Sequence, residues 1–288
     1  MIGRGRRLLP IPEYYPPHLT LVKHSVNKRQ GGARNTAVRI AKGDYIQYLD
    51  HDDELAAQSI GRIIGLIREN PGLDILFCDY EENRGGVVRR NNSYIGNSRD
   101  TMTGREFFRT QSIPWTPWQY VYRREFLLDN DLWQVEGHLF EDADYVLKAT
   151  LAAKLMKYSP DVILRYTIAP TQTTRIRRGD DRKIEDMFYL NARVKQIALE
   201  ELSRDEEIGR MIVGQHLYRQ RACIMRYLWR ARFSTILRVL RRYPAVLPNH
   251  DRMLTLSSRH PLLFAVMLQC LKPVLPIARR AYLSRHKA

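Results

Sequence analysis

Residues 44–53, which read DYIQYLDHDD, decide the expected fold of this 288-residue chain. Tyr45–Leu49 is rich in residues that favour extended structure, so it predicts a buried strand that ends abruptly at Asp50. Asp50, Asp52 and Asp53 then place three carboxylates within one turn. Carboxylates this close repel one another unless a cation or N–H donors neutralise them. The stretch therefore predicts a strand that leads into an anionic, functional turn.

The segments after this strand predict an α/β domain. Apolar residues at helical spacing indicate a helix over Glu54–Asn70, which Pro71-Gly72 ends. Leu73–Cys78 then reads as another buried strand. Strand, helix and strand in this order indicate a βαβ unit with a parallel sheet, and ligands of such sheets bind at the carboxyl ends of the strands. The acidic turn lies at such an end.

Further elements are expected on both sides of this unit. Before it, the sequence predicts a short strand at Leu19–Lys23, a turn at Gly31-Gly32 and a helix at Ala33–Lys42. After it, Asp79–Ser112 is polar and long, which indicates a loop or a lid. The remaining expected elements are a strand at Trp115–Tyr122, helices at Arg124–Asn130 and Glu141–Ala153, a strand at Val162–Tyr166, and helices beyond Asp180.

Basic charge is concentrated at the C-terminal end. The net charge is +16, and residues 210–288 hold 16 Lys and Arg residues but a single acid, Asp251. We therefore divide the chain into an extended arm at 1–20, an α/β domain at 21–178 and a basic helical region at 179–288. Such a charge attracts polyanions, of which an anionic membrane surface is the expected partner. Nucleic acid is not expected, because the basic residues are scattered among apolar ones and form no known reader motif.

The most apolar stretch of the chain is Pro261–Ile277, but Gln269, Lys272 and two prolines interrupt it. A spanning helix needs about 20 mostly apolar residues, so an interfacial anchor or an ordinary core helix is favoured. The three cysteines form no CxxC or Cys/His cluster and indicate reduced core residues. No secretory signal follows Met1, so the catalytic part is expected in the cytoplasm, at the inner face of the membrane.

Two acidic sites are candidates for chemistry. Asp50 and Asp52 offer hard oxygen ligands that suit Mg²⁺ or Mn²⁺, and such ions keep open positions for phosphates. Asp53 could belong to this set or cap the following helix. Glu141 and Asp142 follow an apolar pair, and an apolar wall raises the pKa of a carboxyl group toward the range of a general base. Acids at a helix start are also routine caps.

The order of these pieces resembles one enzyme family. The elements N-x-x-x-GGARNTA at 27–37 and AKGDYI-x-YLD-x-DD at 41–53 are followed by WQYVYRREFL at 118–127, Glu136-Gly137 and Glu141-Asp142. This order is similar to that of the family 2 inverting glycosyltransferases, over roughly residues 19–170. The resemblance implies a GT-A fold, an α/β fold of mixed or parallel sheet with flanking helices, here followed by the basic helical region.

The resemblance also implies roles for individual residues. Asp50 and Asp52 match the metal-binding Asp-x-Asp, and Asp142 matches the base that deprotonates the acceptor hydroxyl. The expected reaction moves a sugar with inversion from a nucleotide-diphosphate sugar donor to a glycan or lipid-linked acceptor of bacterial surface polysaccharide type. The residues expected to contact substrates are Arg34, Asn35, Asp50, Asp53, Glu141 and Trp118, although Trp118 could equally be a core residue.

The chain departs from the family pattern at its start. Met1–Thr20 supplies neither a Pro-x-Tyr-Asn-like turn nor an Asp-Asp-Gly-Ser turn, so about the first two βα units of the family are expected to be absent. An alternative is therefore an inactive glycosyltransferase-like protein whose basic helices bind membranes or partners. A phosphatase with Asp50 as the nucleophile is disfavoured, because the match over Asn27–Gly43 would then be coincidence.

Overall fold

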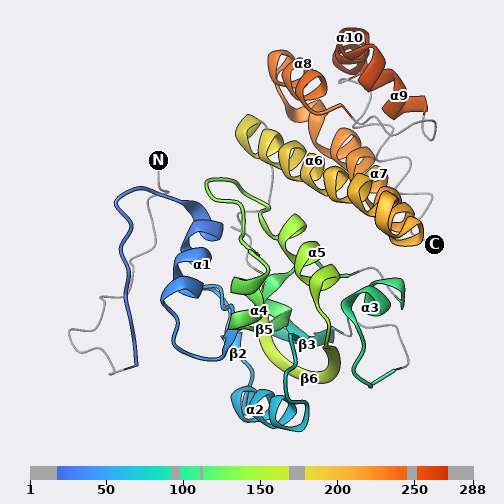
Figure 1. Cartoon of the computed structure of the whole chain (residues 1–288). Helices are drawn as coiled ribbons and strands as arrows, with labels where there is room; N and C mark the ends of the chain where they lie inside the picture. The colour runs from blue at the N-terminus through green and yellow to red at the C-terminus, as the bar shows by residue number, and fades with distance from the viewer. Residues whose placement is uncertain (1–17, 92–97, 111–112, 169–178, 245–251, 272–288) are drawn as a thin grey trace.

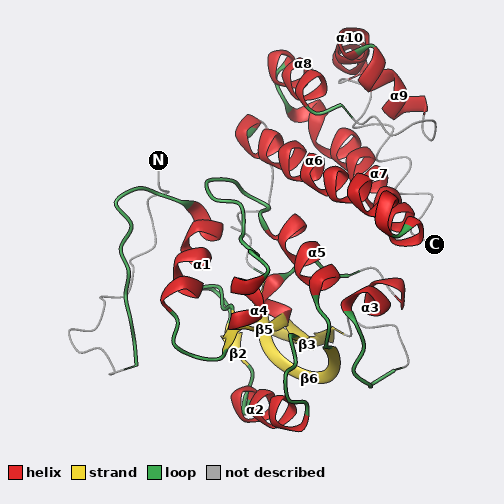
Figure 2. Ribbon diagram, in the orientation of Figure 1, coloured by secondary structure: helices red, strands yellow, loops and turns green. Residues whose placement is uncertain are grey.

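The computed structural model describes residues 18–91, 98–110, 113–168, 179–244 and 252–271 (Figures 1 and 2). The first half of the described chain contains α1 (Arg29–Ile40), β1 (Tyr45–Gln47), β2 (Glu54–Leu55), α2 (Ser59–Glu69), β3 (Ile75–Arg84), β4 (Val87–Asn91), α3 (Gly104–Thr110), the 3-10 helix η1 (Pro117–Gln119), β5 (Tyr120–Arg123) and α4 (Arg124–Asp129). The second half contains α5 (Asp142–Ala152), β6 (Met156–Thr167), α6 (Asp181–Arg204), α7 (Glu206–Tyr227), the 3-10 helix η2 (Leu228–Arg230), α8 (Phe233–Arg242), α9 (Arg252–Arg259) and α10 (Pro261–Leu271).

The six strands form one mixed sheet. Five of the strands follow the order β1-β5-β3-β6-β2. The sixth strand, β4, is outside this order and pairs with β3. β3 and β6 are parallel, whereas the other pairs are antiparallel. β1 and β3 are each antiparallel to β5, so they run in the same direction with β5 between them. The strand–helix–strand order of β1, α2 and β3 is confirmed. The fold class is the expected α/β one, and of the mixed or parallel sheet expected, the structure has the mixed form.

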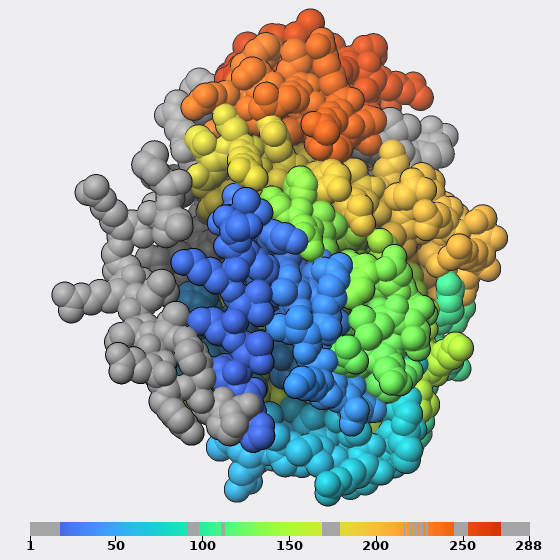
Figure 3. Space-filling model, turned by 60° about the vertical axis from the view of Figure 1, so that its left-hand side comes forward, coloured from blue at the N-terminus to red at the C-terminus, as the bar shows by residue number. Residues whose placement is uncertain are grey.

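Helices cover both sides of this sheet (Figure 1). α2 lies on one side, and α1, α3 and α5 lie on the other. α6 and α7 pass over α5, and α8, α9 and α10 continue away from the sheet. Figure 3 shows the same tiers from another direction, with the cyan residues of α2 at the bottom and the orange C-terminal helices at the top.

Two apolar cores follow from this arrangement. The larger lies between the sheet and its helices, and the second lies among the C-terminal helices. α6 contributes to both, because Ile184 and Phe188 are buried in the second core while Val194 and Ile197 are buried in the first. The helical region is therefore packed directly onto the α/β part by a single continuous helix.

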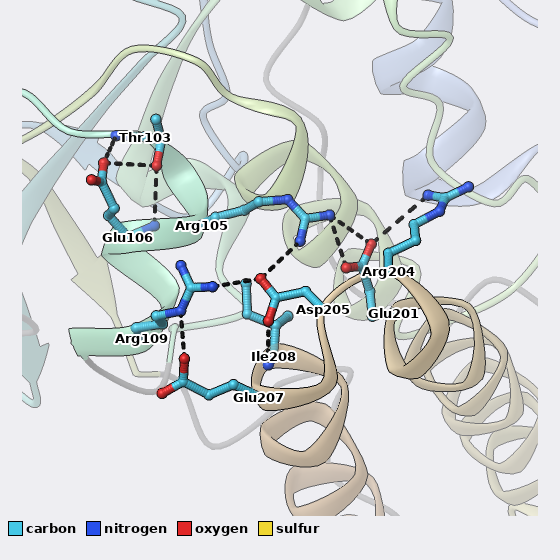
Figure 4. Close-up of polar contacts among 9 residues, drawn as sticks. All are labelled: Thr103, Arg105, Glu106, Arg109, Glu201, Arg204, Asp205, Glu207 and Ile208. Carbon is cyan, nitrogen blue, oxygen red and sulfur yellow. Dashed lines mark hydrogen bonds and ion pairs between the residues drawn. The ribbon is translucent and has the colours of Figure 1, made fainter.

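An ion-pair network strengthens this packing (Figure 4). Arg105 of α3 lies 2.8 Å from Glu201 of α6, and Arg109 lies 2.7 Å from Glu207 of α7. Arg109 also pairs with Asp205, whose carboxylate caps α7 by accepting the Ile208 N–H at 3.2 Å. The turn between α6 and α7 is thus held by two arginines of α3.

The predictions before the acidic turn are wrong in two places. Residues 19–23 form no strand, and all of them are exposed; no strand within the described residues pairs with them. Gly31 and Gly32 lie inside α1, which begins at Arg29, instead of in a turn. A Cβ on Gly31 would lie 2.5 Å from the Val135 carbonyl oxygen, so the glycine serves close packing of the helix.

The predictions after the acidic turn need two corrections. Glu54 and Leu55 form β2, paired with β6, and α2 begins only at Ser59. Asp79–Ser112 is no single loop, because β3 continues to Arg84 and turns through Gly85-Gly86 into β4, after which α3 follows. Both glycines have positive φ, which permits this tight turn. Sheet pairing over these polar residues overrides their loop-like composition.

The later elements are confirmed where the structure describes them. α4, α5 and β6 contain the expected helix starting at Arg124, helix starting near Glu141 and strand at Val162–Tyr166, and the expected strand after Trp115 is shorter, because η1 precedes β5. The described residues beyond Asp180 are helical apart from their connections. No helix in the described ranges is both long and apolar enough to span a bilayer. Residues 1–17 of the expected arm, and the end of the apolar stretch at 272–277, lie outside the described residues.

Candidate active site

The acidic turn follows β1 at the end of the sheet. The Asp53 N–H donates to the Asp50 carbonyl at 3.1 Å and closes the turn. The side chains of Asp50 and Asp52 are 22% and 31% exposed, so both carboxylates reach solvent. The turn therefore presents two accessible carboxylates on a short, hydrogen-bonded backbone.

Arg34 of α1 connects this turn to the second acidic site. Its guanidinium lies 2.7 Å from Asp50 and 3.7 Å from Glu141, and it donates to Gln134 at 3.3 Å. The group is nearly buried and lies over the ring of Tyr48, with 5.3 Å between the guanidinium carbon and the ring centroid. The structure thus brings Arg34, Asp50 and Glu141 together from three separate segments of the chain.

Asp53 faces inward from the turn. Its Oδ1 accepts the Thr167 N–H at 2.9 Å, whereas its Oδ2 is buried without a hydrogen-bond partner among the described residues. Burial, with a smaller contribution from the charges of Asp52 and Asp50, raises the pKa of Asp53 from 3.8 to about 6, although the Thr167 hydrogen bond lowers it. Asp53 does not cap α2, because β2 and a short turn separate the two.

Glu141 and Asp142 mark the start of α5. Glu141 is 3% exposed, and burial raises the pKa of its carboxyl group, which the Arg34 charge partly offsets. Asp142 is the first residue of the helix and remains partly exposed. Acids at this position interact favourably with the N-terminal end of the helix dipole. Asp142 is thus the more accessible acid of the pair, and Glu141 is the one that Arg34 joins to the acidic turn.

Asn35 holds the backbone between α4 and α5. Its side-chain amide donates to the Gln134 carbonyl at 2.8 Å and to Glu136 at 3.2 Å, and its oxygen accepts the Gln134 N–H at 3.0 Å. Asn35 is 4% exposed. These contacts give Asn35 a structural task in the site, and its predicted contact with substrate stays a prediction.

Trp118 lies within an aromatic cluster of the sheet. Its ring stacks on Tyr166 with centroids 5.1 Å apart and meets Tyr80 edge-on at 4.9 Å. The residue is 5% exposed, so core packing accounts for its position. Its predicted contact with a sugar stays a prediction.

The acidic turn fits a divalent cation in part. Arg34 and Gln30 both donate to Oδ1 of Asp50, which leaves Oδ2 of Asp50 and the carboxylate of Asp52 as oxygen donors. Within the described ranges, no three His, Cys, Asp or Glu side chains converge into a metal cluster. Mg²⁺ is often held by one or two carboxylates, with water and substrate phosphate completing the shell. The donor set is compatible with that mode of binding.

Several residues of the site had no recognisable signal in the sequence. Gln30 and Gln134 contact Asp50 and Arg34, but a glutamine in a helix or loop carries no motif. His138 contacts Asp186 at 2.8 Å, 48 residues away. This pair becomes evident only from the position of α6, which carries Asp186.

Comparisons with known proteins indicate a family of enzymes. Residues 8–130 match the family model described as "Glycosyl transferase family 2". The chain is 24% identical over 192 residues to the uncharacterized glycosyltransferase YibD of Escherichia coli K12, covering 63% of this chain and 55% of that protein. It is 28% identical over 162 residues to the uncharacterized glycosyltransferase EpsJ of Bacillus subtilis 168, covering 54% and 46%. The chain thus spans about half the length of these curated relatives.

A solved structure shares the fold. The crystal structure of S. aureus TarS 1-349 in complex with UDP-GlcNAc superposes with a TM-score of 0.60 at 17% identity, covering 85% of this chain and 72% of that one. Identity this low supports the fold alone. The expected GT-A type of fold is confirmed.

Proposed function

Because residues 8–130 match the family 2 glycosyltransferase model, we propose that the chain transfers a sugar from a nucleotide-diphosphate donor to a hydroxyl of a glycan or lipid-linked acceptor. The observation that carries this proposal is the bridge from Asp50 through Arg34 to Glu141, which places a donor-type acidic turn beside the acids that open α5. A transfer reaction needs both the group that binds the donor diphosphate and the base for the acceptor hydroxyl close to the same anomeric carbon.

The acidic turn would bind the donor diphosphate. Asp52 and the free oxygen of Asp50 would hold Mg²⁺ or Mn²⁺, which would stabilise the charge that develops on the departing diphosphate. Arg34 orients Asp50 through a charged hydrogen bond of 2.7 Å, and Arg34 is itself held by Gln134. The UDP-GlcNAc bound to the TarS structure supports a nucleotide sugar as the donor class.

Asp142 would serve the acceptor side as general base. The acceptor hydroxyl attacks the anomeric carbon, its proton passes to the Asp142 carboxylate, and the bond from that carbon to the diphosphate oxygen breaks with its electron pair on the diphosphate. Attack opposite the leaving group inverts the anomeric configuration. Asp142 suits this task because it is partly exposed at the helix start, next to the buried Glu141.

Transfer and hydrolysis assays with several nucleotide sugars, with and without Mn²⁺, test the proposal. Asp52→Ala is expected to abolish metal-dependent donor binding, measured by calorimetry. Asp142→Ala is expected to keep donor binding and lose at least about a hundredfold in rate. Asp129→Ala, at an exposed residue of α4, is the matched control. Absence of any metal-dependent nucleotide-sugar binding by the wild-type chain would refute the catalytic proposal and leave the basic helices as the functional part.

We further propose that the chain works at the inner face of the cell membrane. One face of α10, formed by Phe264, Ala265 and Leu268, is buried in the helical core. The opposite face exposes five large apolar side chains, those of Leu262, Leu263, Val266, Met267 and Leu271. Residues 210–288 carry 16 basic side chains against one acid, so an anionic lipid surface complements both the charge and the apolar face.

Co-sedimentation with phosphatidylglycerol vesicles tests this location. Wild-type protein is expected to bind, and Leu263→Asp is expected to reduce binding by at least about fivefold, because it places a charge in the apolar face. Leu199→Asp, at an exposed leucine of α6, is the control. Equal binding of both variants, or a stronger affinity for duplex DNA than for vesicles at each salt concentration, would argue against a membrane role for α10.

A further inference from the structure

We infer that Asp186 of α6 is a positioning residue that holds the segment leading into Asp142. This segment, residues 130–141 between α4 and α5, is called the acceptor loop below. The effect of Asp186 on sugar transfer rests on the proposed function, because the loop directly precedes Asp142, the proposed base. The contacts of Asp186 with the loop can be tested even if the protein shows no activity.

The Asp186 carboxylate makes two contacts with the acceptor loop. Oδ1 lies 2.8 Å from Nδ1 of His138, and Oδ2 accepts the Leu139 N–H at 3.2 Å. Asp186 is 4% exposed, so these contacts satisfy a carboxylate that is otherwise removed from water. A buried acid that reaches a backbone N–H of another segment fixes that segment in position.

Neighbouring residues of α6 hold the same part of the loop. Arg182 donates to the Gly137 carbonyl at 3.4 Å, and the ring of Tyr189 lies 4.3 Å from that of His138. Positions 182, 186 and 189 follow the spacing of one helix face. A single face of α6 thus contacts three consecutive residues of the loop, 137 to 139.

The loop backbone needs such restraint. Gly137 and Phe140 have φ values of +78° and +66°, and a left-handed conformation is unfavourable for a phenylalanine. The side chain of Phe140 packs against the core of the C-terminal helices. Contacts with the helical region therefore maintain a conformation that the loop would not adopt by itself.

The other part of the loop is held from the opposite direction. Asn35 of α1 bonds both the N–H and the carbonyl of Gln134, and the Gly137 N–H donates to the Lys28 carbonyl at 3.0 Å. The acceptor loop is therefore fixed between α1, which carries the donor-side Arg34, and α6. Because Glu141 and Asp142 follow directly, Asp186 sets the position of the proposed base without touching substrate.

Hydrogen–deuterium exchange of peptides that cover residues 136–142 tests the structural part. Asp186→Ala is expected to accelerate exchange of the Leu139 amide at least about tenfold, because its hydrogen-bond acceptor is lost. Asp186→Asn keeps an oxygen acceptor and is expected to retain most of the protection. Glu200→Gln, at an exposed acid of the same helix, is the control. Unchanged exchange in folded Asp186→Ala, with the fold verified by circular dichroism, would overturn the inference.

Steady-state kinetics test the catalytic part. Asp186→Ala is expected to lower kcat at least about tenfold and to leave donor affinity within about twofold, because misplacing a reacting group slows the chemical step. Asp186→Asn is expected to restore most of kcat. Equal losses in the two variants, or a loss of donor affinity alone, would contradict positioning of the base. An inactive wild-type chain would count against the proposed function, while the exchange measurement would still decide on the Asp186 contacts.

Discussion

Replacing Asp53 by Asn is expected to change how the stability of this protein depends on pH. Burial raises the pKa of Asp53 in the folded state to about 6, from an ordinary value of 3.8. The folded state therefore binds the proton more tightly than the unfolded state. The resulting stabilisation is complete below pH 3.8 and is lost as the pH rises through about 6. Above pH 7 the ionised, buried carboxylate destabilises the fold.

The magnitude follows from the size of the shift. A difference of about 2 pKa units corresponds to about 3 kcal/mol, at about 1.4 kcal/mol per unit. Asn cannot ionise, but it keeps an oxygen that can accept the Thr167 N–H. Its buried amide adds a cost of about 1 kcal/mol that does not depend on pH. The unfolded state is already more than half ionised at pH 4, so the stability of Asp53→Asn relative to wild type should rise by about 2.5 kcal/mol between pH 4 and pH 8.

Urea unfolding followed by tryptophan fluorescence, at pH 4 to 8 in EDTA, measures this difference. EDTA removes divalent cations that would favour the ionised carboxylate. Asp129→Asn, at an exposed position of α4, is the control and is expected to shift stability by less than about 0.5 kcal/mol at any pH. A stability difference between Asp53→Asn and wild type that stays constant from pH 4 to pH 8 would refute the reasoning, because it would mean that burial does not perturb Asp53.

Three further predictions concern the bridge across the site and the interface with the helices. Arg34→Met leaves the buried Glu141 without its cation and is expected to destabilise the protein by about 3 kcal/mol in urea; a loss below about 1 kcal/mol would contradict the role of the bridge. The Asp52 side chain is 31% exposed, so Asp52→Asn is expected to change the free energy of unfolding by less than about 0.5 kcal/mol. The same variant is expected to weaken Mn²⁺-dependent nucleotide-sugar binding at least about tenfold. A calorimetric titration with unchanged affinity would exclude Asp52 as a metal ligand. A double-mutant cycle on Arg105 and Glu201 is expected to give a coupling energy of about 1 kcal/mol, and additive losses would show that the ion pair of Figure 4 does not stabilise the interface.

Structural features that depend on residues close together in the sequence could be predicted from it. The strand at Tyr45 and the helix that begins at Asp142 follow from residue type and from periodicity, and both are present. The acidic turn follows the strand as expected. The order of motifs also indicated the fold, since it joins segments more than 80 residues apart that no single spacing rule connects.

Structural features that depend on contacts between residues far apart in the sequence could not be predicted. Gly31 suggested a turn, because nothing near it in the sequence shows that Val135 packs against the helix at that point. Asp53 had the pattern of a helix cap, but its partner is Thr167, 114 residues away. Asp186 had no motif at all, and its role depends on where α6 crosses the acceptor loop. In each case a tertiary contact outweighs local propensity.

Gly31 also constrains which inherited changes this site can tolerate. A Cβ at this position would lie 2.5 Å from the Val135 carbonyl oxygen and 3.1 Å from Cγ of Glu141. Every missense change of a glycine codon adds a side chain, so no amino-acid exchange at this position is sterically neutral. Any such exchange would push α1 away from the acceptor loop, and Arg34 would move with its helix. We therefore expect a point mutation in this codon to disable both halves of the site at once, although the codon specifies no chemically reactive group.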